Sequence, residues 1–147
     1  MEGVVILDSG VLLASVFPDE LYSLQAVTLL DSLLEDGFAL HAPMLLRYEI
    51  VASLRKAVYR TRISQADAVV RRDLLLVRKI QFYVDDTLLK RAFDIATELN
   101  QPTAYDAQYL ALAEQLGCEL WTADERLFNA AQSRFGFVRW LGQFKVN

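Results

Sequence analysis

The hydrophobic residues follow two alternating patterns along the chain. Short apolar runs, typical of buried strands, are separated by longer stretches in which apolar residues recur every three or four positions, as on one helix face. The predicted strands are residues 4–7, 38–41, 80–84, 118–122 and 137–141. The predicted helices are residues 19–36, 43–60, 64–79, 87–100, 103–117 and 124–132, with a further helical turn at 10–17. This alternation predicts an α/β fold, a three-layer α/β/α sandwich around a mainly parallel sheet.

Individual residues mark several of the predicted helix ends. Gly37 follows the second helical segment, as glycine does at many helix C-termini. Pro43 suits the first turn of a helix, and Ser64 suits an N-cap. Thr103 and Asp106 have the spacing of a capping box. These residues place the helix boundaries between the strands.

Composition and length narrow the class of protein. The 147 residues are 54% hydrophobic and 23% charged, which excludes a disordered chain and suits a single domain over residues 1–147. Cys118 is the only cysteine, so a reducing, cytoplasmic location is the expectation. No apolar run is long enough to span a membrane, and residues 1–7 lack the basic leader of a signal peptide.

Charge is distributed unevenly along the chain. Residues 1–46 contain no Lys or Arg, whereas residues 47–91 contain eleven. Such a basic segment either forms solvated helix faces or provides a local surface for nucleic acid, and an acidic chain can carry one. The candidate phosphate contacts are Arg47, Arg55, Arg60, Arg62 and Arg126.

Two aspartates follow predicted strands. Asp8 ends the first apolar run, and Asp124 lies two residues beyond the strand that ends at Thr122. In parallel sheets, sites form beyond the carboxyl ends of the strands. Each aspartate also has an ordinary structural interpretation, as a turn or cap residue, and Asp124 is well placed as the N-cap of the next helix.

Two further acids occupy helix positions where a charge is costly. Glu49 falls on the apolar stripe of its helix, so it needs a partner, for which an arginine such as Arg47 is the simple candidate. Asp106 is turned roughly 160° from Gln108 at ~100° per residue, away from the polar side of its helix. Its simple alternative is a capping-box carboxylate bonded to the backbone of Thr103.

Together the acids Asp8, Glu49, Asp106 and Asp124 predict a cation site. Two unit charges ~4 Å apart repel by about 4 kcal/mol at an effective dielectric near 20, so converging carboxylates raise one another's pKa or bind a cation. Oxygen ligands suit Mg²⁺ or Mn²⁺ rather than Zn²⁺. Such an ion activates water and neutralises a phosphodiester, which points to a nuclease.

The four acids lie in stretches that resemble the PIN-domain family, and most of all its VapC-type toxin ribonucleases. The stretches are Val4-Val5-Ile6-Leu7-Asp8-Ser9, Leu45-Leu46-Arg47-Tyr48-Glu49, Ala104-Tyr105-Asp106-Ala107-Gln108-Tyr109-Leu110-Ala111-Leu112-Ala113 and Leu120-Trp121-Thr122-Ala123-Asp124-Glu125-Arg126-Leu127. Any one of them is weakly specific, but the ordered set is specific and spans essentially the whole chain.

This resemblance implies a fold, an activity and partners. It implies a three-layer α/β/α fold and a Mg²⁺- or Mn²⁺-dependent endoribonuclease, the toxin of a toxin–antitoxin pair, with a cognate antitoxin and a homodimer as partners. Its catalytic, metal-binding acids fall on Asp8, Glu49, Asp106 and Asp124, and its supporting polar residues on Ser9 and Thr122. Ser9 would orient Asp8, and Thr122 would orient Asp124, although either hydroxyl could instead cap the backbone.

One position departs from the family pattern, and two other functions stay open. Many relatives have Asn where this chain has Ala52, which removes a supporting hydrogen bond but no metal ligand. A phosphatase of the aspartate-nucleophile type needs a second Asp at the position of Gly10, so it is disfavoured. The remaining alternative is a catalytically inactive PIN-like module that binds RNA or protein.

Overall fold

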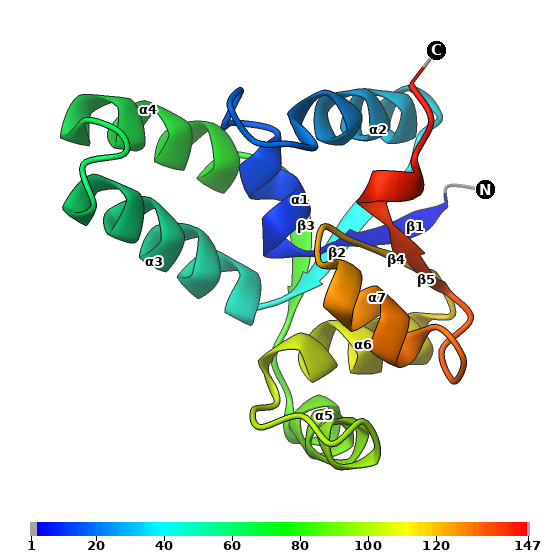
Figure 1. Ribbon diagram of the computed structural model, residues 1–147. Coiled ribbons are helices and arrows are strands. Elements are labelled where there is room, and N and C mark those ends of the chain that lie inside the picture. The colour runs from blue at the N-terminus through cyan, green and yellow to red at the C-terminus, as the bar shows by residue number, and fades with distance from the viewer. Residues whose placement is uncertain (1–2, 147) are drawn as a thin grey trace.

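The computed structural model describes residues 3–146, whose strands form one parallel sheet between two layers of helices (Figure 1). The sheet has five strands in the order β3-β2-β1-β4-β5. Their bounds are β1 Val4–Leu7, β2 Ala39–Pro43, β3 Ile80–Tyr83, β4 Glu119–Thr122 and β5 Val138–Trp140. The predicted α/β/α fold is therefore confirmed, while residues 1, 2 and 147 of the predicted domain lie outside the described part.

The helices divide between the two faces of the sheet according to their place in the chain (Figure 1). On one side lie α1 Ser9–Ala14, α2 Ser23–Glu35, α3 Leu45–Tyr59 and α4 Gln65–Leu76. On the other lie α5 Asp86–Glu98, α6 Tyr105–Leu116 and α7 Glu125–Ala131, and the short 3₁₀ helix η1 Leu141–Gln143 follows β5. Helices α3 and α4 form a hairpin that projects from one side of the molecule (Figure 1).

The strand order reverses direction once, next to the central strand. From β1 the chain moves outward to β2 and β3, and it then returns to place β4 on the other side of β1 before β5. The reversal therefore lies between β1 and β4, whose register pairs Leu7 with Trp121. In open parallel sheets, the crevice at the carboxyl ends of such a strand pair is where ligands bind.

The core is centred on β1 and α6. Val5, Ile6 and Leu7 of β1 are buried, because strands and helices cover both faces and both edges of this strand. Helix α6 contacts three strands on one side and packs along α5 on the other. Its residues 109–113 are all buried, which is why this helix is apolar almost all round.

Two predicted helix starts are wrong. Pro43 is the last residue of β2, and the Met44 N–H still donates to Tyr83 O across 2.9 Å, so strand pairing continues and α3 begins at Leu45. Thr103 does not cap α6, because the helix begins at Tyr105 with Ala104 as an N-cap that makes no side-chain bond. Pro43 and Thr103 are local signals of a helix start. At both positions the packing of the neighbouring segment decides where the helix begins.

Other predicted boundaries agree with the structure. The Ser64 hydroxyl accepts a hydrogen bond from Asp67 N at 3.0 Å and caps α4. Gly37 follows α2 with φ of +83°, a conformation that favours glycine. Helix α2 itself begins at Ser23, four residues later than the pattern predicts, because residues 18–22 form turns.

Truncating the core of α6 should be costly. Leu110→Ala removes a fully buried side chain between the sheet and α5, so we expect the free energy of unfolding to fall by about 2–5 kcal/mol. Urea denaturation measures this loss. The matched control is Leu24→Ala, because Leu24 on α2 is 64% exposed and should lose far less. Equal losses in the two variants would contradict the assignment of α6 to the centre of the core.

Candidate active site

The strand reversal between β1 and β4 brings Asp8 and Thr122 together. Asp8 follows β1, and its backbone N–H donates to Trp121 O at 3.0 Å, which extends the β1–β4 pairing by one residue. Thr122 is the last residue of β4 and is fully buried. Hydrogen bonding to the Thr122 side chain lowers the pKa of Asp8, so the two side chains are in contact.

Asp8 is the most buried of the four acids. Its Oδ1 accepts a hydrogen bond from Val11 N at 3.0 Å, which makes Asp8 the N-cap of α1. Burial raises the pKa of Asp8 to about 6, although hydrogen bonds from Thr122 and from the Val11 and Ala123 backbone act in the opposite direction. The nearby charge of Asp106 raises it further. Burial therefore destabilises the ionised form of Asp8, and a bound cation would stabilise it.

Gly10 allows this approach of α1 to the β4–α7 turn. A Cβ at position 10 would lie 3.1 Å from the Ala123 Cβ and 3.3 Å from Asp8 Oδ1, tighter than ordinary contacts. A larger residue would push α1 away from Asp8. Gly10, where an aspartate-nucleophile phosphatase would need a second Asp, therefore has a packing role at the site.

An open cleft of about 560 Å³ lies at this end of the sheet. Asp8, Asp106 and Asp124 all line it, so three of the four predicted acids share one cleft. Residues of α1, of the β4–α7 turn and of α7 complete its wall, namely Ser9, Gly10, Ala123, Glu125 and Arg126. Glu125, in the first turn of α7, is a cleft residue that the sequence did not single out, whereas its neighbour Arg126 was a candidate phosphate contact.

Glu49 stands beside this cleft and is held by Tyr109. The Tyr109 hydroxyl donates to Glu49 Oε1 at 2.6 Å, from a ring that is only 1% exposed. Burial raises the pKa of Glu49, the bond from Tyr109 lowers it, and the charge of Asp106 raises it again. Burial and the Glu49 charge together raise the pKa of Tyr109 as well, so the phenol remains a donor.

An arginine was the simple structural alternative for Glu49, and Arg47 does not fill that role. The guanidinium of Arg47 lies over the Phe82 ring, 5.3 Å from its centroid, and makes no ion pair with Glu49. The sequence placed Tyr109 beside Asp106 on the inner side of α6, one turn along the helix. Only the tertiary structure shows that its hydroxyl reaches a residue 60 positions away.

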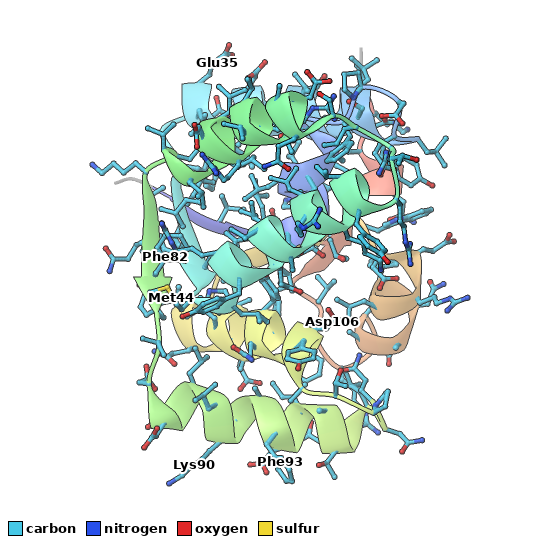
Figure 2. All side chains as sticks on the ribbon, turned by 90° about the vertical axis from the view of Figure 1, so that its left-hand side faces the viewer. Glu35, Met44, Phe82, Lys90, Phe93 and Asp106 are labelled. Atoms are coloured by element: carbon cyan, nitrogen blue, oxygen red, sulfur yellow. The ribbon has the colours of Figure 1, made fainter. Side chains whose placement is uncertain are left out.

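Asp106 is free of the capping role considered for it. Within residues 3–146 the Asp106 carboxylate forms no hydrogen bond. It projects from the first turn of α6 (Figure 2). Burial raises the pKa of Asp106, and the charge of Asp124 raises it further. Asp106 is therefore a half-buried carboxylate with no stabilising donor, which is the state a cation ligand would have before binding.

Asp124 caps helix α7 and also lines the cleft. Its Oδ1 accepts from Arg126 N at 2.9 Å and from Leu127 N at 3.3 Å, so it caps α7. It also lines the cleft and acts on the pKa of Asp106. Capping uses one carboxylate oxygen, Oδ1, in both bonds.

The supporting hydroxyl of Thr122 contacts Asp124, the acid expected for it, through the Asp124 backbone, and that of Ser9 acts on Glu49 and Tyr109. Ser9, expected beside Asp8, instead lowers the pKa of both Glu49 and Tyr109 by hydrogen bonding. Thr122 Oγ1 accepts from the Asp124 backbone N–H at 3.0 Å, as well as contacting Asp8. Thr122 thus links the first and last of the four acids.

The donor types at the site fit a hard divalent ion. Carboxylate and hydroxyl oxygens surround the cleft, and three of the four acids have pKa values raised by burial and by one another's charge. In the side-chain positions found among residues 3–146, no three such groups are close enough together to hold one ion. The site therefore matches Mg²⁺ or Mn²⁺ by chemistry and charge rather than by a preformed ligand set.

Comparison with known proteins agrees with this arrangement. The PIN domain family model matches residues 5–132. A VapC ribonuclease of Mycobacterium bovis and Ribonuclease VapC9 of Mycobacterium tuberculosis are each 39% identical over 115 residues, covering 71% of this chain and 87% of each relative. The chain belongs to the PIN-domain family, in its VapC-type branch.

Solved structures share the fold of this PIN-domain chain. PAE2754 from Pyrobaculum aerophilum has a TM-score of 0.66 at 22% identity, over 97% of this chain and 93% of that one. A chain of FitAB bound to an IR36 DNA fragment has a TM-score of 0.66 at 18% identity, over 97% and 99%. At these identities the likeness supports the fold alone.

Burial of Asp8 gives a testable dependence of stability on pH. Its pKa rises from 3.8 to about 6 on folding, so the folded protein is destabilised relative to an uncharged variant as pH increases through that range. Asp8→Asn keeps the acceptor for Val11 N. We expect it to be more stable than wild type by about 2–3 kcal/mol at pH 8 in EDTA, and about equal near pH 4.

Urea denaturation of both proteins across this pH range measures the difference. Asp31→Asn is the matched control, because Asp31 lies on the exposed surface of α2 and its replacement should leave the pH dependence unchanged. A stability gain that does not vary with pH would contradict the burial of a charge at Asp8.

Removing the Tyr109 hydroxyl tests its pairing with Glu49. Tyr109→Phe leaves the ring in place but deprives a half-buried carboxylate of its donor, so the free energy of unfolding should fall by about 1–3 kcal/mol at pH 8. In a Glu49→Gln background the loss should be smaller, because the acceptor is then uncharged. A double-mutant cycle by urea denaturation gives the coupling, and zero coupling would show that the bond does not form in solution.

Proposed function

We propose that this chain is a Mg²⁺- or Mn²⁺-dependent endoribonuclease that hydrolyses phosphodiester bonds in RNA. The observation that carries the proposal is the shared cleft of Asp8, Asp106 and Asp124, with Glu49 beside it, at the reversal of strand order. Burial and mutual repulsion raise the pKa of Asp8, Glu49 and Asp106, so the centre favours a positive ion. Two relatives are named ribonucleases, which supports RNA as the substrate class.

Asp8, Glu49, Asp106 and Asp124 are the residues we assign to the metal. When bound, the ion would supply activation of water and neutralisation of charge on the phosphodiester. The chain's own groups prepare the site for it. Thr122 orients Asp8 through its hydroxyl, and Tyr109 and Ser9 hold the Glu49 carboxylate.

The biological setting is also proposed. A VapC-type chain suggests the toxin half of a toxin–antitoxin pair, with a cognate antitoxin and a homodimeric assembly. The single cysteine, Cys118, is consistent with a reducing cytoplasm. Among residues 3–146, no helix combines the length and apolar character needed to span a membrane.

Asp106→Asn tests the assignment of the acids. The substitution keeps the side chain's size and removes its charge, so the fold should persist while RNA cleavage falls by more than the ~10–100-fold typical of losing an outer-shell partner. Cleavage of labelled single-stranded RNA is measured with Mg²⁺, with Mn²⁺ and with EDTA. The matched control is Asp94→Asn on the exposed surface of α5, which should cleave as wild type does.

The outcomes separate the proposal from its alternative. Cleavage retained by Asp106→Asn, or cleavage that continues in EDTA, would contradict the metal-dependent mechanism. RNA binding by the wild type without cleavage under either metal would instead identify a catalytically inactive binding module.

A further inference from the structure

Helix α3 carries a polar stripe that begins at Glu49. Ser53, Lys56 and Arg60 follow Glu49 at intervals of four, three and four residues, which places all four side chains on one side of the helix. Arg60 is the C-cap residue of α3. The stripe therefore runs from Glu49 to the C-terminal end of the helix.

A second cleft, of about 280 Å³, lies between this stripe and α1. Ser53, Lys56 and Arg60 line one wall, while Leu13 of α1 and Phe17 beyond it provide apolar surface. Gly10, one helical turn before Leu13, lines the acidic cleft. The two clefts therefore follow one another along α1.

The positive charges in this second cleft fall into two kinds. Arg62 is already neutralised, because its guanidinium contacts Asp19 at 3.2 Å and Glu20 at 3.1 Å and lies 4.3 Å over the Phe17 ring centroid. Lys56 and Arg60 are exposed, and neither makes an ion pair with any residue in the range 3–146. The rim thus keeps two cations that the protein does not use for its own stability.

The distances of Lys56 and Arg60 from Glu49 along α3 relate these two cations to the acidic centre. At 1.5 Å of rise per residue, Lys56 and Arg60 lie ~10 Å and ~16 Å along α3 from Glu49. A strand with its scissile phosphate at the acidic centre would bring its next few phosphates past these positions. Leu13 gives this cleft apolar surface that suits a sugar, whereas the Phe17 ring is only 3% exposed and lies under the guanidinium groups of Arg62 and Arg71.

We propose that the α1–α3 cleft binds the backbone of single-stranded nucleic acid, with Lys56 and Arg60 contacting phosphates beside the one at the acidic centre. This rests on the proposed function for its choice of RNA, and it extends that function by placing the substrate strand along α3. The exposed cations on the rim suit the phosphates of such a strand, and the apolar surface of Leu13 suits its sugars.

The test is the double variant Lys56→Gln/Arg60→Gln, which removes both unpaired charges. Binding of a fluorescein-labelled single-stranded RNA of mixed sequence is followed by anisotropy in EDTA, at several salt concentrations. We expect Kd to rise about tenfold or more at low salt, and the slope of log K against log salt to become shallower by about 1.4 for two phosphates.

The matched control is Lys79→Gln/Lys90→Gln, which makes the same change in net charge elsewhere. Lys79 precedes β3, and Lys90 lies on the outer side of α5, away from α3 (Figure 2). Its binding and salt slope should match those of wild type. Unchanged urea midpoints would show that both double variants remain folded.

Several outcomes would overturn the proposal. One is a salt slope for Lys56→Gln/Arg60→Gln equal to that of the control pair. Another is the absence of RNA binding by wild type. Loss of binding to a poly-glutamate peptide with RNA binding unchanged would assign the cleft to an acidic protein segment instead.

Cleavage assays with Mg²⁺ separate this proposal from the proposed function. If both hold, Lys56→Gln/Arg60→Gln raises KM several-fold with little change in kcat. If wild type cleaves RNA and the Lys56→Gln/Arg60→Gln variant does so with unchanged KM, the nuclease function holds and the proposed role of the cleft is refuted. Wild type that binds RNA through the pair without cleaving it keeps the cleft and refutes the nuclease.

Discussion

The burial of the Asp8 carboxylate is the constraint on which the arrangement of this end of the molecule depends. Asp8 ends the central strand of the sheet, where its side chain is only 8% exposed. An ionised group in such a place needs donors or a counter-ion. The donors come from the first turn of α1, from Thr122 at the end of β4 and from the turn that follows it. Even so, burial dominates, and the pKa of Asp8 remains raised to about 6.

The same constraint extends to the other acids, each of which is supported differently. Glu49 receives a hydrogen bond from the buried Tyr109, and Asp124 is held by the backbone at the start of α7. Asp106 has neither kind of support and feels the charge of Asp124. The result is a group of carboxylates that form no ion pair within residues 3–146, although Arg126 lines the same cleft. The unpaired Lys56 and Arg60 lie further along α3, beyond Ser53. Such a separation of charge suits a polyanionic strand that meets a cation at one point and the protein at others.

The sheet topology explains why residues distant in sequence meet here. Parallel strands end at the same edge, so the turns after β1 and β4 are neighbours although more than a hundred residues separate them. Helix α6 crosses beneath both strands and presents Asp106 from its first turn and Tyr109 one turn later. Because α6 is buried between the sheet and α5, these two side chains have little freedom to move away from the site. The structural core and the candidate site are thus built from the same helix.

The sequence by itself determined the alternation of strands and helices, the type of sheet and the four acids as candidates. Hydrophobic periodicity records which side of each element is buried, and a charge on such a side is visible without a structure, as it was for Glu49 and Asp106. The sequence could not assign partners. Tyr109 rather than an arginine meets Glu49, and Thr103 does not cap α6. Each of these depends on the distance between segments far apart in the chain, and only the packing of α3 and α6 against the sheet decides that distance.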